Sequence, residues 1–314
     1  MINVIRAVSF GIVVCLPAIC VAEDAPVLHA VLSERMALKS GHFTASGIIS
    51  GLPATTKSSL EVWFDESHWK GELRNRLPVE QAPDGLTRVL LSPDRYLVQV
   101  DSSDAQSFDR TTAKKYIHWF DVRAIGMALV VELEKGYTLA ELIRAHQTSK
   151  QTLTQKRLPD GKIHVQRGPF DPRAENYLTY TVDPECGFCV TEASYIENGT
   201  AKQQAHTQWT TVNGVWVPKN YRLEFNGNTR CDLHFDWVTV NESMSPDVFD
   251  VAKSFKNAKY VLTNVGKDVE EYQAEPLHKG GPRPFTGVAL AGVFVAFTAV
   301  CVGAYLLRRR EILQ

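Results

Sequence analysis

Two cysteines in the run Cys186-Gly187-Phe188-Cys189 are the residues whose types and spacing most readily suggest chemistry. A C-x-x-C pair is typical of thiol oxidoreductases, haem attachment sites and zinc sites. Haem attachment is excluded because Val190, not histidine, follows the pair, and a structural zinc site lacks its second ligand pair. A redox pair is usually followed by a helix N-terminus that lowers a thiol pKa, whereas this pair lies in an expected hairpin loop that leads into a strand. A local Cys186–Cys189 disulfide and two free thiols both stay open.

Cys231 is the third cysteine that lies away from the two ends of the chain. With two-residue turns at the Asn-Gly loops, Cys231 falls three strand spacings from Cys189, on the order of 14 Å. A disulfide needs Cα atoms within about 7 Å of each other, so this pairing is disfavoured. We therefore predict a Cys186–Cys189 bridge at best, with Cys231 buried as a thiol.

No other residue pattern in the sequence indicates catalysis, a metal site or a phosphate site. His146 shares the apolar face of an expected helix without a partner at metal-ligand spacing, which is typical of a packed core histidine. Asp232 and Asp236 flank His234 on the polar face of a strand, as solvated charges usually do. The sequence contains neither a nucleophile-elbow serine nor a glycine-rich phosphate loop. We expect a non-enzymatic protein with no cofactor and no metal.

The composition excludes several further classes of protein. The chain has 314 residues, with 34 basic and 35 acidic side chains and 44% hydrophobic residues. Balanced charge excludes a basic nucleic-acid binder, and ordinary apolar content with six cysteines excludes a disordered tail or a disulfide scaffold. The apolar residues are concentrated at the two ends, and the roughly 260 residues between them are long enough for a large domain.

Residues 1–22 have the pattern of an export signal. One basic residue, Arg6, precedes an apolar run that is too short to span a bilayer. Small residues lie at the first and third places before Glu23, which is typical of a signal-peptidase site. We expect cleavage after Ala22, with an uncleaved anchor as the alternative.

Phe285–Leu307 is a second apolar stretch of 23 residues without a charge, and three arginines follow it directly. At about 1.5 Å per residue a helix of this length reaches ~34 Å, which is enough to cross the hydrocarbon core. The arginines favour a cytoplasmic tail at residues 308–314. We expect a single-pass membrane protein whose large domain lies on the periplasmic or extracytoplasmic side, joined by a polar tether at 256–284. A cleaved C-terminal sorting signal, suggested by Gly280-Gly281, is the alternative.

The exported middle begins with a helical pattern and continues with short strands. The helix is indicated by apolar residues at helical spacing that end at Gly41. They are Val27, Leu28, Val31, Leu32 and Met36. Five extended segments follow, and alternate residues in each share a face. They are His42–Ser50, Ser59–Phe64, His68–Arg74, Thr87–Leu91 and Arg95–Asp101.

A second helix is expected over about residues 139–147. Thr138 and Glu141 form a capping box at its start, and Leu139 and Ile143 lie on its apolar face.

The second half of the middle has the pattern of an antiparallel meander. Its expected strands are Asn176–Val182, Phe188–Glu197, Thr200–Val212, Val215–Phe225 and Thr229–Val240. Asn-Gly pairs separate the last four strands, and this pair favours a two-residue hairpin because both central residues need φ > 0. On the last two strands alternation places one set of apolar side chains on a single face. They are Val217, Leu223, Leu233, Phe235 and Trp237.

Several stretches of the middle resemble the bacterial periplasmic lipoprotein-carrier (LolA-like) superfamily. Gly214–Pro218, followed by Trp237–Asn241 and a Pro-Asp-x-Phe that ends at Phe249, is similar to the close of that family. Leu32–Ser50 is similar to its first helix and strand. The resemblance covers most of residues 25–255. It implies an α+β fold with a strongly curved antiparallel sheet, an incomplete β-barrel, whose concave face is covered by helices.

The resemblance implies that residues 23–255 form this half-barrel domain and that its concave face holds acyl chains. The residues expected to contact the ligand are Val217, Leu223, Leu233, Phe235 and Trp237. Apart from any resemblance, a sheet with one continuous apolar face must cover that face. The two expected helices are the natural covers. They either leave a cavity or fill the interior completely.

These observations lead to three hypotheses about function. The first is a membrane-tethered domain that binds an acyl chain, lipid or lipoprotein locally, since a chain held by its own span does not shuttle. The second is a structural or protein-interaction module of the cell envelope with a filled core. The third is a thiol oxidoreductase, which requires a pKa below the unperturbed value of about 8.5 at Cys186 or Cys189.

Overall fold

The structure, a computed structural model, describes most of the chain between residues 26 and 276. The described segments are residues 26–48, 57–75, 85–101, 104–108, 120–129, 138–148, 152–169, 175–255, 258–264 and 272–276. The expected export signal (1–22), membrane span (285–307) and tail (308–314) lie outside them. None of the helices in the described segments is long and apolar enough to cross a membrane.

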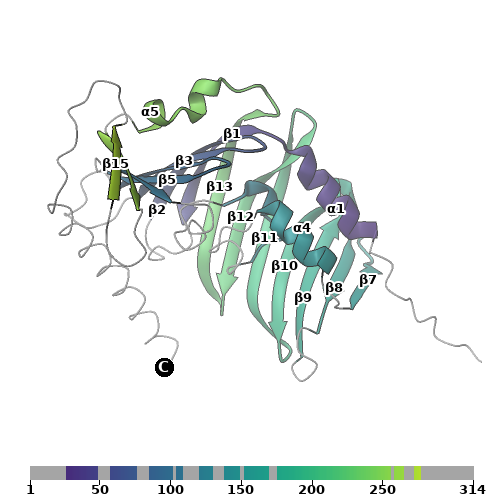
Figure 1. The fold of residues 1–314 in the computed structure, drawn as a ribbon. Coiled ribbons are helices and arrows are strands. Elements are labelled where there is room, and N and C mark those ends of the chain that lie inside the picture. The colour runs from purple at the N-terminus through teal and green to yellow at the C-terminus, as the bar shows by residue number, and fades with distance from the viewer. Residues whose placement is uncertain are drawn as a thin grey trace, which may run out of the picture.

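One strongly curved sheet dominates the fold and does not close on itself (Figure 1). Its 15 strands lie in the order β15-β14-β6-β5-β4-β3-β2-β1-β13-β12-β11-β10-β9-β8-β7, so β15 and β7 form the two edges. Neighbouring strands are antiparallel except β14 and β6, which are parallel. This arrangement confirms the predicted α+β class with a curved, unclosed sheet.

The strands divide into a first group that precedes α4 and a meander that follows it. The first group is β1 (Gly41–Ile48), β2 (Lys57–Phe64), β3 (Trp69–Asn75), β4 (Leu86–Leu91), β5 (Tyr96–Val100) and β6 (Ala105–Phe108). The meander is β7 (Leu153–Arg157), β8 (Ile163–Arg167), β9 (Asn176–Asp183), β10 (Cys189–Glu197), β11 (Thr200–Val212), β12 (Val215–Phe225) and β13 (Asn228–Val240). Two strands follow the meander, β14 (Tyr260–Asn264) and β15 (Tyr272–Pro276).

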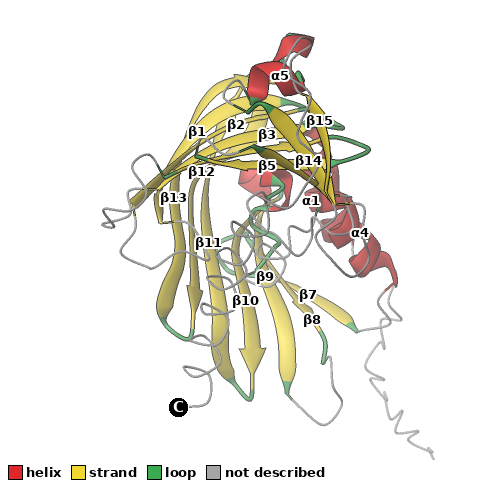
Figure 2. Ribbon diagram, turned by 60° about the vertical axis from the view of Figure 1, so that its left-hand side comes forward, coloured by secondary structure: helices red, strands yellow, loops and turns green. Residues whose placement is uncertain are grey.

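Short helices lie on both sides of the sheet (Figures 1 and 2). Those on the concave side are α1 (Pro26–Ala37), the 3-10 turn η1 (Val122–Ala124) and α4 (Leu139–Thr148). Those on the convex side are η3 (Pro246–Phe249) and α5 (Val251–Ser254). A further 3-10 turn, η2 (Pro184–Cys186), joins β9 to β10.

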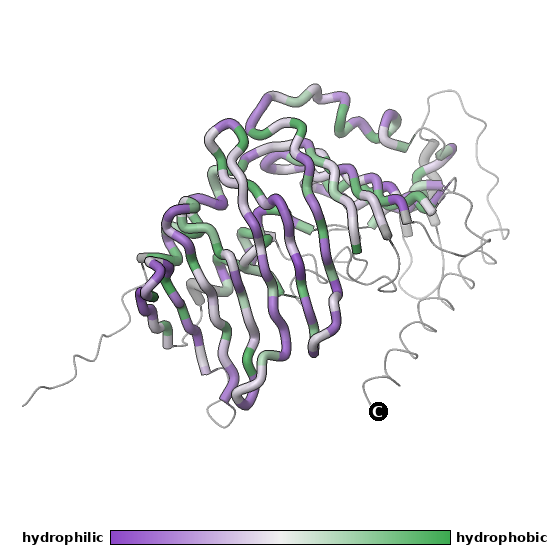
Figure 3. Tube along the Cα trace, turned by 180° about the vertical axis from the view of Figure 1, so that it is seen from behind, coloured by the Kyte–Doolittle hydropathy of each residue, from purple (hydrophilic) through white to green (hydrophobic). Residues whose placement is uncertain are grey.

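Asn-Gly pairs make the tight turns of the meander, as predicted. Asn198 and Gly199 have φ values of 49° and 73°, and Asn213 and Gly214 have values of 50° and 76°. These left-handed values are unfavourable for most residues but acceptable for Asn and Gly. The turns therefore hold β10, β11 and β12 together as hairpins, and hydropathy alternates along the strands (Figure 3).

The main hydrophobic core lies on the concave side of the sheet, between the strands and the covering helices. The alternation is clearest in β13, where Cys231, Leu233 and Phe235 are buried while Asp232 and His234 are exposed. The predicted division into an apolar and a polar face is therefore confirmed for this strand.

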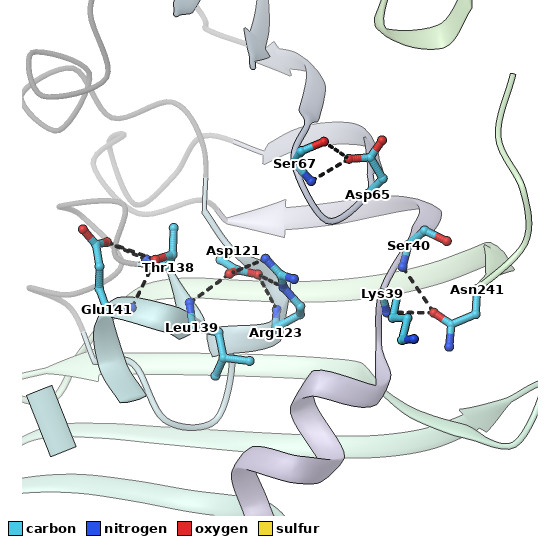
Figure 4. A network of polar contacts seen from close by, with 10 residues as sticks. All are labelled: Lys39, Ser40, Asp65, Ser67, Asp121, Arg123, Thr138, Leu139, Glu141 and Asn241. Carbon is cyan, nitrogen blue, oxygen red and sulfur yellow. Dashed lines mark hydrogen bonds and ion pairs between the residues drawn. The ribbon is translucent and has the colours of Figure 1, made fainter. Parts of the chain in front are cut away.

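The α1 helix presents a buried stripe to the sheet at the spacing expected of an amphipathic helix. Its members are Val27, Leu28, Val31, Leu32, Arg35 and Leu38, the last in the turn that follows the helix. Beyond the helix, Asn241 accepts hydrogen bonds from the backbone N of Lys39 (2.8 Å) and Ser40 (3.2 Å) (Figure 4). The Asn241 amide also donates to the carbonyl oxygen of Ala37. This contact fixes the end of α1 against the end of β13.

A network of hydrogen bonds joins η1 to α4 (Figure 4). Asp121, 5% exposed, accepts from the backbone N (3.0 Å), Nε (2.8 Å) and Nη2 (3.0 Å) of Arg123. Asp121 also accepts from the backbone N of Leu139 (2.9 Å), the first residue of α4. Thr138 and Glu141 form the predicted capping box, with backbone-to-side-chain hydrogen bonds in both directions. Together, the shared carboxylate and the capping box hold η1 and α4 as one unit.

A second, smaller core lies on the convex side of β4 to β6. Leu90 and Leu97 point away from the main core and pack with Ala105, Phe255 and Val261. The chain after β13 crosses this convex face through η3 and α5 before β14 joins β6 (Figure 2). This part of the sheet is therefore buried on both faces.

The structure corrects the boundary between the half-barrel and the expected tether. β14 and β15 fall within residues 256–284, where the sequence indicated only a polar linker. Val261 and Leu262 are buried because β14 pairs with β6, so the sheet continues beyond residue 255. The short strands β6, β7 and β8 were not predicted either.

Candidate functional site

The five residues predicted to contact a ligand lie together on the concave side, but inside the packed core. Val217, Leu223, Leu233 and Phe235 are at most 3% exposed. Trp237 is half-buried and donates from Nε1 to a carbonyl oxygen of β12 at 2.8 Å. These side chains therefore belong to, or pack against, the main hydrophobic core.

A row of partly exposed side chains crosses the concave face near the other end of the strands. Leu178 of β9 pairs with Tyr195 of β10, which pairs with Gln203 of β11, which pairs with Phe225 of β12. We call these four residues the concave row. The strands β9 to β12 extend beyond α1 and α4 (Figure 1), and the four residues lie within three positions of a strand end. Leu178, Tyr195 and Phe225 pack against the main core but remain partly exposed.

Small side chains line the sheet between the concave row and the covering segments. Ala193 of β10 lies opposite Ala205 of β11, and Tyr180 and Leu223 flank this pair. All four residues are buried. We call Ala193 and Ala205 the floor, since they present only methyl groups between larger neighbours.

Arg35 is the charged member of the buried stripe of α1, and it is 1% exposed. Its guanidinium carbon lies 4.2 Å from the centre of the Trp209 ring on β11. Its Nη2 donates to the carbonyl oxygen of Trp216 and lies 3.7 Å from Sγ of Cys189. In the part of the chain that the structure describes, Nε and Nη1 have no hydrogen-bond partner. Two of the three guanidinium nitrogens are therefore buried without an acceptor.

The charge of Arg35 has no carboxylate within ion-pair distance among the described residues, and Glu34 acts on it only at longer range. Burial lowers the pKa of Arg35, while Cys189 and Glu34 act to raise it. Arginine still stays protonated at neutral pH, since its ordinary pKa is above 12. Among the described residues Arg35 makes no ion pair. Burying a cation without a counter-ion costs several kcal/mol by general estimates, so this arrangement needs a reason.

Thr207 is a second polar group left without a partner on the same face. It lies on β11 two residues before Trp209, so both side chains point to the concave side. Thr207 is 5% exposed, and its Oγ1 has no hydrogen-bond partner within the described segments. Tyr221, the residue of β12 that pairs with Thr207, donates from its hydroxyl to the carbonyl oxygen of Ala128 at 3.2 Å. Buried polar atoms in native proteins are normally hydrogen-bonded, which makes Thr207 an exception.

The position of Arg35 in the sequence is itself unusual. Arg35 continues the buried stripe of Leu28 and Val31 at helical spacing, whereas Met36, expected on the apolar face, is 59% exposed. An arginine is rarely fully buried unless it is paired. An arginine at a core-facing helix position is therefore a candidate binding residue. Thr207 gave no such signal.

No disulfide joins the Cys186-x-x-Cys189 pair in the structure, where Cys186, Cys189 and Cys231 are all free cysteines. The choice between a Cys186–Cys189 bridge and two thiols stays a prediction. Burial raises the pKa of Cys189 to about 12, and burial together with Asp183 raises the pKa of Cys186. The thiol oxidoreductase hypothesis requires a shift in the opposite direction.

A cleft of about 640 Å³ lies at the rim of the sheet beside the β2–β3 turn, lined by Asp65, His68 and residues of the segment 242–250. His68 stacks on Phe249, and its Nδ1 lies 3.1 Å from Asp65 Oδ2 and 2.9 Å from Ser67 Oγ. Asp65 also accepts from the backbone N of Ser67 (Figure 4). A histidine that activates a serine contacts the acid and the serine through different ring nitrogens, so these residues form a turn, not a catalytic triad.

Comparisons with known proteins give matches among solved structures only. No family model and no curated protein matches the sequence. Among solved structures, the chain is similar to a LolA superfamily protein from Nitrosomonas europaea, with a TM-score of 0.39 and 12% sequence identity. The match covers 71% of this chain and 94% of that chain. No residue role is transferred at this similarity, and membership of the family stays a prediction.

Proposed function

We propose that the half-barrel binds the acyl chain of a lipid or lipoprotein against its concave face and performs no catalysis. The concave row is the observation that supports this most directly. Leu178, Tyr195 and Phe225 remain partly exposed on an inward-facing apolar surface. The polar Gln203 lies between Tyr195 and Phe225, and the guanidinium carbon of Arg230 lies 5.6 Å from the centre of the Phe225 ring. Partly exposed apolar side chains gathered on one face are typical of binding sites.

The path from the concave row toward α1 suits a long apolar chain. Along β11 it runs from Gln203 past Ala205 to Trp209, six residues or about 20 Å, the length of a long-chain acyl group. The methyl groups of the floor, Ala193 and Ala205, lie between the two ends of this path. Entry of the chain would require the segment after η1, whose Ala128 accepts a hydrogen bond from the Tyr221 hydroxyl, to move outward. Each buried methylene contributes about 0.8 kcal/mol to binding.

A structural or protein-interaction module with a filled core is the second candidate. It is favoured by the burial of Val217, Leu223, Leu233 and Phe235, each at most 3% exposed. On this alternative the concave row is only the margin of the core, and no ligand enters.

Photolabelling with a photoactivatable palmitate separates the two candidates. The full chain is labelled in the membranes of the expressing cells, and modified peptides are identified by mass spectrometry. Acyl binding predicts labels within residues 176–197 and 200–225. Labels confined to residues 285–307 would contradict the proposal, since they would report only a segment surrounded by lipid, and the filled-core candidate would then stand.

A pair of matched variants tests whether labelling depends on the concave row. Phe225→Asp places a charge on the inward apolar surface and is expected to reduce sheet labelling about tenfold. Val238→Asp is the control, because Val238 is 58% exposed on β13. Far-UV circular dichroism checks that both variants fold. Equal labelling of the two variants would show that the concave row is not the site.

We further propose that the half-barrel is exported and held at the membrane by residues 285–307. The apolar patterns at the two ends of the sequence support this placement. Protease added to spheroplasts is expected to digest the half-barrel while leaving cytoplasmic marker proteins intact. A half-barrel protected to the same degree as the cytoplasmic markers would contradict the proposal.

A further inference from the structure

We propose that Arg35 and Thr207 bind the anionic head group, a carboxylate or phosphate, of the acyl lipid that the half-barrel takes up. The inference rests on the proposed function. It adds the chemical class of the head group and the two residues that recognise it.

Within the described segments Arg35 forms no ion pair, and the charge of Glu34 acts on it only from beyond ion-pair distance. The Trp209 ring and the Trp216 carbonyl oxygen stabilise the guanidinium through a cation–π contact and one hydrogen bond. Cys189 is the ionisable group beside Nη2, but burial keeps it as a neutral thiol. An oxyanion at Nε or Nη1 would supply the missing charge and the missing acceptor together.

Thr207 is an independent observation that points to the same ligand. Its Oγ1 is buried without a partner on the strand whose Trp209 ring contacts Arg35. A hydroxyl can donate to an oxyanion, as an unpaired guanidinium N–H can. Two elements far apart in the sequence, α1 and β11, thus bring unsatisfied donors to one side of the sheet.

The positions of these two residues also fit the path proposed for the acyl chain. Thr207 and Trp209 are about 7 Å apart along β11, between the floor and the turn to β12. A head group held there directs its chain over Ala205 toward Gln203 and the concave row. The charged end of the ligand is then buried under α1, and the apolar end lies where the strands extend beyond the helices.

Competition against the photoactivatable palmitate tests the head-group preference. The full chain in native membranes is labelled in the presence of palmitate, hexadecyl phosphate or hexadecanol, which share a chain length and differ in head group. At least one of the two anionic competitors is expected to displace the label at a concentration about tenfold lower than hexadecanol does. The order of palmitate and hexadecyl phosphate identifies carboxylate or phosphate as the preferred group.

Four variants connect that preference to the two residues. Arg35→Met is expected to bring the anion-to-alcohol ratio to about one without changing displacement by hexadecanol, and Arg35→Lys to retain part of the ratio. Thr207→Val is expected to lower the ratio by a smaller factor, about threefold. Arg222→Met is the control and is expected to leave the ratio unchanged, because Arg222 is exposed and pairs with Glu224 on the polar face.

Two results overturn the inference and leave acyl binding intact. One is equal displacement by hexadecanol and both anions in the unaltered chain. The other is an anion preference that persists in Arg35→Met. A chain that shows no sheet labelling at all overturns the proposed function and the head-group inference with it. Displacement by hexadecanol serves as the folding check for each variant, because a misfolded chain loses it.

Discussion

Arg35 of α1 and Arg123 of η1 belong to different segments on the concave side, and they differ in whether a carboxylate neutralises their charge. Arg123 of η1 makes a two-pronged hydrogen bond to the buried carboxylate of Asp121. Burial acts to lower the pKa of Arg123, but the contact with Asp121 outweighs it and the net shift is upward. Arg35 of α1 is more deeply buried, has no carboxylate partner, and has a lowered pKa. The fold thus pairs Arg123 with a carboxylate and buries Arg35 without an ion pair among the described residues.

The two arginines differ because η1 and α4 are joined to each other by a charged group, whereas α1 is held by a neutral one. Asp121 satisfies both Arg123 and the first N–H of α4, so η1 and α4 are tied by a buried charge pair. The α1 helix is tied at its end by a neutral amide, Asn241. An acidic residue, Glu34, is available beside Arg35 in the sequence, yet the two make no ion pair. This contrast is what the proposed head-group site at Arg35 would explain.

Removing the Asp121 carboxylate should produce the largest effect. Asp121→Ala removes the acceptor of the half-buried Arg123 and of the Leu139 N–H, and it is expected to lower the free energy of unfolding by about 3 kcal/mol. Urea unfolding followed by circular dichroism measures this loss. Asp160→Ala, at an exposed turn, is the control and should change stability by less than about 0.5 kcal/mol. A loss below about 1 kcal/mol for Asp121→Ala would remove the contrast between the covers.

The thiol beside Arg35 should make stability depend on alkaline pH. The pKa of Cys189 is about 12 in the folded chain and 9.0 for an ordinary cysteine. Between about pH 9 and pH 12 the unfolded chain loses this proton while the folded chain keeps it, so stability falls as pH rises. The slope contributed is up to about 1.4 kcal/mol per pH unit. Cys189→Ala should remove that part of the slope, whereas Cys186→Ala should keep it. Identical pH profiles for Cys189→Ala and the unaltered chain would mean that Cys189 ionises normally and could serve as the counter-ion of Arg35.

Replacing each arginine by methionine compares the roles of Arg35 in α1 and Arg123 in η1 directly. Arg35→Met removes an unpaired buried charge and is expected to raise the free energy of unfolding of the ligand-free chain by about 1 kcal/mol. Arg123→Met leaves the buried carboxylate of Asp121 without its guanidinium partner and is expected to lower the free energy of unfolding by about 3 kcal/mol. Thermal and urea unfolding of the two variants measure the difference. A large loss for both would make Arg35 a structural residue like Arg123.

The smallest effect is expected for Thr207→Val. Valine has nearly the shape of threonine and lacks the hydroxyl that has no partner, so the free energy of unfolding should stay the same or rise by less than about 1 kcal/mol. The same urea titration measures it. A loss above about 1 kcal/mol would show that the Thr207 hydroxyl is satisfied in solution, which would weaken the proposal that Thr207 and Arg35 bind the same head group.

The meander was predictable because its signals are local. Asn-Gly turns and strict alternation determine where β11 and β12 begin and end, and the predicted bounds agree with the observed ones. The capping box at Thr138 and Glu141 placed the start of α4 for the same reason. By contrast, β14 is a strand because it pairs with β6, which is distant in the sequence, and β15 pairs with β14 in turn. No local pattern encodes this pairing.

The candidate site was less predictable because long-range packing creates it. Bulges between Tyr195 and Ile196 and between Gln208 and Trp209 each shift the pairing by one residue, and the alternation pattern does not reveal them. The apolar residues predicted for the ligand site are buried, since alternation identifies a face but not which part of it is covered. The burial of Arg35 depends on contacts with residues more than 150 positions away in the chain.

The contact of Asn241 with the end of α1 also constrains the order of folding. Its side chain bonds the backbone of Ala37, Lys39 and Ser40 across sequence separations of 204, 202 and 201 residues. β1, which follows α1, pairs with β13 over a comparable separation. Contacts this distant in sequence slow folding, because the loop must close before they form. During synthesis the first helix therefore waits for nearly the whole sheet before it is secured, and α1 is the last cover to be fixed.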